Sequence, residues 1–305
     1  MEFNNKILIR EVGPRDGFQM EKAFIPTESK IEIINMLSKA GYKEIQTSAF
    51  VHPKAVPNMK DAETVFNQIE KQNGVIYSAL IPNERGYLRA VESKLEKVEL
   101  TLSATDSHNI NNMNATTNES IERLKACIEM EKNTKVTLGL AVAFHCHFEG
   151  IVPYSKIENI IGRCAEIGID EVSLGDTTGN ANPKQVFYTY DQLKKAFPKI
   201  KFGFHPHNTY GNAMANSIAA LEANVDVIDS SVAGIGGCPY SPGASGNISS
   251  EDLIYTLESM GIHTGINLDI VHKAARMVHN TVGHSESNYL RLDVPKTTVH
   301  KQNNS

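Results

Sequence analysis

The sequence predicts an α/β protein with the (β/α)8 fold of a TIM barrel, followed by additional C-terminal helices and a glycine-rich active-site loop. Eight short apolar runs rich in β-branched residues alternate with longer amphipathic segments, as successive strands and helices would. No proline- or serine-rich linker divides the chain. An open, doubly wound sheet is the alternative, but no G-x-G-x-x-G motif follows the first run.

The expected strands are apolar runs of a length that suits buried strands. In chain order they are Ile7–Val12, Glu44–Ala49, Val75–Ile81, Val98–Ser103, Val136–Phe144, Glu171–Asp176, Lys201–His207 and Val225–Val232. Helices are expected where apolar residues recur every three or four positions. The clearest are Lys30–Ala40, Ser120–Glu131, Ser155–Glu166 and Ala213–Ala223, with Glu251–Met260 and Asp269–Asn280 after the eighth run. Thr27 is the expected N-cap of the first helix, and Gly41 follows its end.

Length and composition fit one globular domain. Of the 305 residues, 41% are hydrophobic and 21% are charged, which excludes a disordered, collagen-like or coiled-coil chain. We expect a single domain over residues 1–305. Its barrel is expected at about residues 7–232, and the loop and C-terminal helices at about 233–295.

The charge pattern argues against nucleic acid and membranes as partners. The net charge is −5 and no long basic run occurs. No apolar stretch reaches about 18 residues, and the N-terminal segment carries charges where a signal peptide has an apolar core. The four cysteines, Cys127, Cys146, Cys164 and Cys238, form no C-x-x-C pair, which is typical of reduced thiols. We therefore expect a cytoplasmic protein.

Polar residues gather where the expected strands end, although the strands themselves are apolar. They are Glu11, Arg15 and Asp16 after the first, Gln46 in the second, His145 and His147 in the fifth, Asp176 and Thr177 in the sixth, His205, His207 and Asn208 in the seventh, and Asp229 in the eighth. Buried polar groups are costly unless they are paired or used. Because barrel enzymes carry their active sites at this end, we predict an active site here.

His205 and His207 are the sharpest local feature. Residues two apart on a strand point to the same side, so both imidazoles would face one point. The alternative is a purely structural histidine pair. An aspartate from the first strand and an amide oxygen from the glycine-rich loop would complete a set of two nitrogens and two oxygens. Such a set favours Mg²⁺ or Mn²⁺ over structural zinc.

Two further features point to chemistry near this site. Arg15 and Asp16 lie between two glycines, where a guanidinium beside a metal could stabilise an enolate or bind a carboxylate. The alternative is an ion pair on a surface turn. Cys238 lies in a loop of glycines and prolines. It is either an incidental thiol or an acid, base or nucleophile carried by a lid.

Three segments carry a resemblance to a known family. They are EVGPRDG at residues 11–17, SLGDT at 173–177 and SVAGIGGCPY at 231–240, the last continuing to Gly246 and Asn247. The sequence resembles the 3-hydroxy-3-methylglutaryl-CoA lyases, which belong to a superfamily of metal-dependent aldol-type lyases and Claisen-type synthases. The resemblance covers about residues 7–270.

The resemblance implies a role for each matching residue. Asp16, His205, His207 and Asn247 match the ligands of one divalent cation, and His205 is also counted among the catalytic residues. Arg15 matches the group that stabilises the thioester enolate. Cys238 matches a loop cysteine that takes part in proton transfer. Asp176 and Glu251 match supporting acidic residues near the metal, and Asp176 is also expected to be a catalytic residue.

The implied reaction is cleavage of a 3-hydroxyacyl-CoA between C2 and C3, which for the usual substrate gives acetyl-CoA and acetoacetate. We expect an acyl-CoA substrate, a divalent cation (Mg²⁺ or Mn²⁺) and a homodimer. Substrate contacts are predicted at Gln46, Thr177, Asn83, Gly236 and Gly237, and a supporting role is predicted for Asn208.

Four departures from the family pattern suggest a changed substrate pocket. Gln46 and Asn208 stand where family members usually have Glu and Asp, which removes two negative charges near the cation. His145 and His147 replace a glycine and a proline. Asp106 replaces Glu, and the loop after it lacks a usual basic residue.

These departures keep three other interpretations open. One is a lyase for a related 3-hydroxyacyl-CoA. Another is a Claisen-type synthase that joins acetyl-CoA to a 2-oxo acid, which Asn208 would suit but the GGCPY loop does not. The third is a barrel that binds CoA or metal without catalysis.

Overall fold

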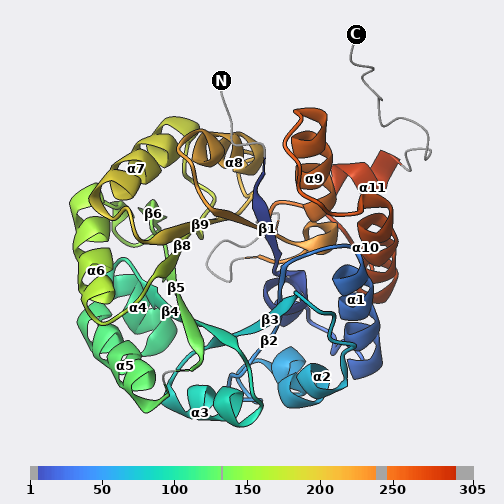
Figure 1. Ribbon diagram of the computed structural model, residues 1–305, viewed down its shortest axis with the longest axis horizontal. Coiled ribbons are helices and arrows are strands. Elements are labelled where there is room, and N and C mark those ends of the chain that lie inside the picture. The colour runs from blue at the N-terminus through green and yellow to red at the C-terminus, as the bar shows by residue number, and fades with distance from the viewer. Residues whose placement is uncertain (1–5, 132, 238–245, 293–305) are drawn as a thin grey trace.

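Eight parallel strands close into a barrel in the computed structural model, which describes residues 6–131, 133–237 and 246–292 (Figure 1). The strands are β1 (Leu8–Glu11), β2 (Glu44–Ala49), β3 (Ile76–Ile81), β4 (Lys97–Ser103), β5 (Lys135–Ala141), β8 (Glu171–Asp176), β9 (Lys201–Pro206) and β10 (Val227–Ser230). Around the barrel their order is β1-β10-β9-β8-β5-β4-β3-β2. The (β/α)8 prediction is therefore confirmed, and the open doubly wound sheet is excluded.

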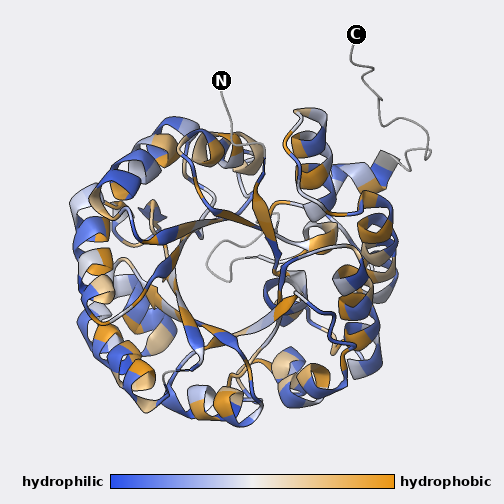
Figure 2. Cartoon of the chain, in the orientation of Figure 1, coloured by the Kyte–Doolittle hydropathy of each residue, from blue (hydrophilic) through white to orange (hydrophobic). Residues whose placement is uncertain are grey.

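Helices surround the barrel and bury their apolar faces against it (Figure 1). They are α1 (Thr27–Lys39), α2 (Ala62–Gln68), α3 (Glu84–Glu92), α4 (Asp106–Met113), α5 (Thr117–Met130), α6 (Tyr154–Glu166), α7 (Pro183–Ala196), α8 (Ala213–Glu222), α9 (Ser250–Ser259), α10 (Leu268–Val282) and α11 (Asn288–Leu292). Polar and apolar residues alternate along these helices, as amphipathic segments require (Figure 2). In the described part of the chain, no helix is both long and apolar enough to cross a membrane.

Two local predictions need correction. The fifth strand ends at Ala141, and His145 lies beyond it in a short antiparallel hairpin of β6 (His145–Cys146) and β7 (Gly150–Ile151). The chain leaves the strand at Val142, whose φ of 49° is incompatible with an extended backbone. Thr27 is the first residue of α1 rather than its N-cap, and its hydroxyl donates to Asp61 over 2.7 Å.

The barrel interior carries charged side chains that are paired with one another. Arg10 of β1 donates to both carboxylate oxygens of Asp229 on β10, over 2.8 and 3.0 Å. Lys97 of β4 donates to Glu44 and Glu171, each over 2.8 Å. Buried charges are tolerated when they are paired in this way. These pairs tie β1, β2, β4, β8 and β10 together beneath the site.

Candidate active site

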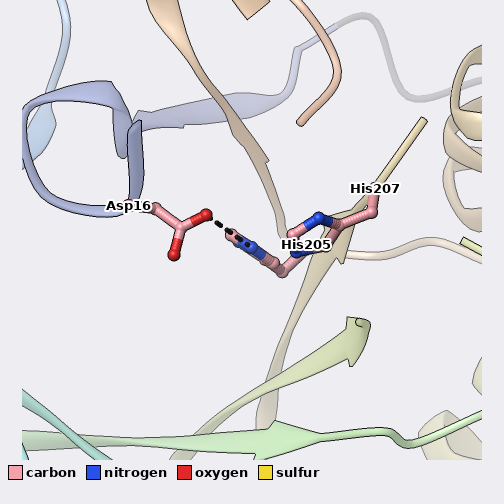
Figure 3. A group of neighbouring side chains, drawn as sticks. All are labelled: Asp16, His205 and His207. Atoms are coloured by element: carbon pink, nitrogen blue, oxygen red, sulfur yellow. Dashed lines mark ion pairs between the residues drawn. The ribbon is translucent and has the colours of Figure 1, made fainter. Parts of the chain in front are cut away.

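Asp16, His205 and His207 converge at the C-terminal end of the barrel. One ligand atom from each lies within 4.8 Å of the others (Figure 3). Asp16 lies in the helical turn η1 (Gly13–Gly17), directly after β1, and His205 and His207 lie at the end of β9. The Asp16 carboxylate points toward the ring of His205, whose Nε2 is 3.7 Å from Oδ2 of Asp16. The predicted cluster is thus assembled from two separate segments.

Two buried atoms at this cluster have no hydrogen-bond partner among the described residues. They are Oδ1 of Asn247 and Nδ1 of His207. Asn247 reaches the cluster because its Nδ2 donates to Oδ2 of Asp16 over 2.7 Å and to the carbonyl of Ile235 over 3.2 Å. Unpaired buried lone pairs are costly unless they serve a ligand. The donor set therefore fits a divalent cation, with nitrogen and oxygen ligands.

Asp229, on β10, orients the imidazole ring of His205. Its Oδ2 is 3.0 Å from Nδ1 of His205, while Arg10 and Ser173 also donate to the same carboxylate. With Nδ1 donating to Asp229, Nε2, the nitrogen nearer Asp16, is the atom that would bind a cation once its proton is displaced. This carboxylate–histidine arrangement is how metal-binding imidazoles are usually fixed.

The charges around the cluster set distinct protonation states. Burial by itself raises the pKa of Asp16, but the charges of Arg15 and both histidines outweigh burial and hold this pKa well below its usual range. Burial lowers the pKa of His205, yet its contacts with Asp16 and Asp229 outweigh burial and raise it to about 9. Burial and the nearby His205 lower the pKa of His207 to about 4. The site thus offers one carboxylate, one neutral imidazole and one imidazole whose proton a cation would displace.

Arg15 lies beside the cluster and is held on three sides. Its Nε donates to Oε1 of Gln46 on β2, and its Nη1 donates to Oδ1 of Asp16. Its Nη2 is 3.9 Å from Oε1 of Glu99 on β4. Gln46 orients the guanidinium through a neutral amide, so it adds no further negative charge to the two carboxylates, Asp16 and Glu99, that already face Arg15.

A cavity of about 620 Å³ borders the candidate metal ligands and Arg15. Its wall includes the cluster, Arg15, and inward-facing residues of β4, β5 and β8, namely Glu99, Thr101, Gly139, Ser173 and Gly175. This volume is typical of a site for a small molecule. The cavity therefore joins the candidate metal cluster to a polar floor inside the barrel.

Comparisons with known proteins now decide the family. Residues 6–278 match the family model described as HMGL-like. Over 285 residues the chain is 40% identical to hydroxymethylglutaryl-CoA lyase YngG of Bacillus subtilis, covering 93% of this chain and 95% of that protein. The chain belongs to the HMGL-like family. The predicted resemblance is therefore confirmed, and these relatives favour a lyase over a synthase.

Solved HMGL-like structures superpose on nearly the whole chain. The HMG-CoA lyase of Bacillus subtilis matches with a TM-score of 0.93 at 40% identity, covering 96% of this chain and 99% of that one. An HMG-CoA lyase of Acinetobacter baumannii, solved in complex with coenzyme A and 3-methylmalate, matches with a TM-score of 0.92 at 36% identity, covering 98% and 99%.

Three residues that are predicted to contact the substrate line the cavity. Two of them, Asn83 and Thr177, are held in place by hydrogen bonds from backbone N–H groups. Asn83 caps α3 by accepting from Gly86, and Thr177 accepts from the backbone N–H of Val142 over 2.8 Å. Gly237 also lines the cavity.

Gly236 lies against the metal cluster. Its φ is 131°, and a Cβ there would overlap the amide of Asn247. Glycine at this position therefore allows the loop to pass close to a proposed ligand.

Two of the predicted site residues, Asp176 and Asn208, hold the backbone around the site. Asp176, at the end of β8, accepts from the backbone N–H of Ala181 over 3.2 Å, and burial raises its pKa to about 6. Asn208 accepts from the backbone N–H of Ala213, before α8. None of Asp176, Asn208 and Gln46 lines the cavity.

Glu251 lies on α9 and supports the start of the glycine-rich loop. Its Oε2 accepts from the backbone N–H of Ala233 over 3.0 Å, and Ala233 has a φ of 61°. Burial raises the pKa of Glu251 to about 8. Cys238, the predicted acid–base residue, lies outside the described residues.

Three residues that shape the site were not predicted from the sequence. Asp229 stood among the strand-end residues but received no role, and neither Arg10 nor Glu99 was recognised. The signal for Glu99 was present in the sequence. Charged Lys97 and Glu99 alternate with apolar residues in β4, which indicates that they point into the barrel.

Proposed function

We propose that this HMGL-like lyase cleaves 3-hydroxy-3-methylglutaryl-CoA to acetyl-CoA and acetoacetate, using one Mg²⁺ or Mn²⁺ ion. The observation that carries the proposal is the convergence of Asp16, His205 and His207 beside Arg15, at the mouth of one cavity. The names of the relatives at about 40% identity support the substrate.

Each group of this chain has a proposed task in the cleavage. A cation held by Asp16, His205, His207 and Asn247 would supply the Lewis acidity that lowers the pKa of the C3 hydroxyl. Arg15 would stabilise the enolate that forms when the C2–C3 bond breaks, because Gln46 holds its guanidinium beside the cluster. Cys238 would return a proton to C2.

The remaining residues position these groups. Asp229 keeps Nε2 of His205 free to ligate, and Asp176 supports the turn that carries Thr177. Glu251 fixes the backbone where the loop of Cys238 begins. Asn83, Thr177, Gly236 and Gly237 are the proposed contacts with the acyl-CoA, with Gln46 acting through Arg15.

The test is release of acetoacetate from 3-hydroxy-3-methylglutaryl-CoA with Mg²⁺, with Mn²⁺ and with EDTA. We expect release that requires a metal and is lost in Asp16→Asn. The exposed Asp170→Asn is the matched control and should keep full activity. Absence of release while calorimetry still shows metal binding would contradict the proposed substrate.

Two further parts of the proposal concern the whole molecule. We infer a homodimer and a cytoplasmic location from the family resemblance and the sequence pattern. Light scattering on the purified protein tests the dimer, and fractionation of cells tests the location.

A further inference from the structure

The floor of the active-site cavity is unusually open and polar for a barrel interior. Barrel interiors are generally filled by bulky branched side chains. Here the inward positions of β4 and β5 carry Glu99, Thr101, Thr137 and Gly139. The strand register pairs Glu99 with Thr137 and Thr101 with Gly139. Gly139 has no side chain, and both Gly139 and Glu99 line the cavity.

Glu99 lacks a close partner of its own. It is 7% exposed, and in the described part of the chain its carboxylate accepts no hydrogen bond. Its ion pairs are long: 3.7 Å to Nη2 of Arg10 and 3.9 Å to Nη2 of Arg15. A buried carboxylate normally takes hydrogen bonds or a close cation, because its desolvation is costly. Glu99 instead presents its oxygens to the cavity.

The cations near Glu99 are already engaged more closely by other carboxylates. Arg10 donates twice to Asp229 within 3.0 Å. Arg15 forms its close ion pair with Asp16. Lys97 donates to Glu44 and Glu171 over 2.8 Å, and Lys201 also lies 3.4 Å from Glu171. Glu99 is therefore a carboxylate that holds none of these cations at close range.

A polar group near Glu99 also lacks a hydrogen-bond partner. Oγ1 of Thr137 is buried and has no hydrogen-bond partner among the described residues. A Cβ at Gly139 would lie 2.8 Å from Oγ1 of Thr101 and 2.9 Å from Oε1 of Glu99, so these two side chains occupy the place that a side chain at residue 139 would take. Glu99 and Thr101 thus bring two oxygens to the cavity wall, and among the described residues no basic nitrogen lies closer than 3.7 Å to Glu99.

We propose that Glu99, in the part of the cavity that Thr101 and Gly139 also line, forms a subsite for a cationic group on the C3 substituent of the substrate, so that the enzyme also cleaves 3-hydroxyacyl-CoAs that carry a quaternary or protonated nitrogen near C3. This rests on the proposed function, because Arg15 and the metal cluster would act on C2 and C3. Glu99 lies 3.9 Å from Arg15, within reach of a substituent one carbon beyond C3.

The cleavage of such a substrate needs no additional reactant. The proton leaves the C3 hydroxyl, C3 becomes a carbonyl, and the C2–C3 bond breaks. The electron pair passes to C2 as the thioester enolate, which takes one proton and becomes acetyl-CoA. The other product is an aldehyde or ketone that keeps the cationic group, and nothing is oxidised or reduced.

Two thioesters of the same shape test the subsite. They are 3-hydroxy-4-(trimethylammonio)butanoyl-CoA and its uncharged isostere, 3-hydroxy-5,5-dimethylhexanoyl-CoA. Their dissociation constants are measured by calorimetry in EDTA, where the metal-dependent cleavage does not interfere. We expect the cationic ester to bind about 10- to 100-fold more tightly, which is the effect of one interaction with a charged group.

Variants test whether Glu99 causes the preference for the cationic ester. Glu99→Gln keeps the volume and removes the charge, and should bring the two constants to within about threefold. Gly139→Ala would place a methyl group against Oγ1 of Thr101 and Oε1 of Glu99, so it should displace the Glu99 carboxylate and reduce the preference for the cationic ester. Glu92→Gln, at an exposed position of α3, is the matched control and should keep the preference. Because the readout is a ratio for two esters, a general loss of folding does not imitate the effect.

The outcomes separate this proposal from the proposed function. Equal binding of both esters by the unaltered protein, or a preference that persists in Glu99→Gln, would overturn the cationic subsite. Cleavage of 3-hydroxy-3-methylglutaryl-CoA would still support the proposed function in that case. A charge preference that depends on Glu99, with cleavage of none of the esters when metal is added, would support the subsite and contradict the lyase reaction.

Discussion

Replacing Asp229 with asparagine should weaken metal binding through His205 without removing a ligand. Both carboxylate oxygens of Asp229 accept from Arg10: Oδ1 from Nε over 2.8 Å, and Oδ2 from Nη2 over 3.0 Å. Oδ2 also accepts from Ser173 and faces Nδ1 of His205. An asparagine must put its NH₂ group at one of these two places, and either place opposes a donor of Arg10.

The contacts decide which orientation is favoured. At the Oδ2 position the NH₂ group would oppose three donors, whereas at the Oδ1 position it opposes only Nε of Arg10. The amide nitrogen therefore takes the Oδ1 position, and His205 keeps an oxygen acceptor that has lost its charge. Hydrogen bonds to neutral acceptors are about half as strong as those to charged ones. We expect a loss of metal affinity of about tenfold, the lower end for groups that orient a ligand.

The assay is titration of the metal-free protein with Mn²⁺, followed by electron paramagnetic resonance. Asp226→Asn is the matched control, because Asp226 pairs with Lys194 over 2.9 Å and faces away from the cluster. The unpaired N–H of Arg10 should also cost about 1–3 kcal/mol of folding stability in Asp229→Asn. A Mn²⁺ affinity equal to that of the Asp226 control, whatever the stability, would refute the reasoning.

Three other perturbations follow from the same geometry. Because burial raises the pKa of Glu251 from 4.5 to about 8, folding favours its protonated form, and stability should fall as the pH rises from about 4.5 to about 8. Thermal unfolding in EDTA at both ends of this range should show a smaller fall in Glu251→Gln. Gly236→Ala should displace Asn247 and weaken Mn²⁺ binding, and an unchanged affinity would argue against Asn247 as a ligand. Cys238→Ala should lower kcat by about 10²- to 10⁴-fold in the acetoacetate assay, and an unchanged kcat would remove Cys238 from the mechanism.

The strands could be predicted from the sequence because each depends on local chemistry. Runs of β-branched residues located β2 and β8 with the bounds that the structure has. The error in β5 has a physical cause. Val142, Ala143 and Phe144 are fully buried, so they continue the apolar run although the chain has already turned away from the strand. Apolar character reports burial, and it does not distinguish a strand from a buried loop.

The candidate metal ligands could also be predicted from local sequence, whereas the residues that hold these ligands in place could not. His205 and His207 share one face because of the two-residue period of a strand, which the sequence displays directly. Asp229 and Arg10 are separated by 219 residues, and only the closed barrel makes them a pair. The position of Glu251 in the sequence did not show which group it contacts. It is expected to support the metal site, and in the structure its carboxylate accepts from the backbone N–H of Ala233.

These contacts connect the barrel interior to the reacting groups in a continuous chain. Arg10 holds Asp229, Asp229 holds His205, and His205 faces Asp16, whose other oxygen accepts from Arg15. Each member fixes the orientation of the next, so the charged interior sets which imidazole nitrogen is free for a ligand. Glu99 stands beside this chain without a close partner in it. Its carboxylate lines the cavity instead, where the proposed cationic substituent of the substrate would meet it.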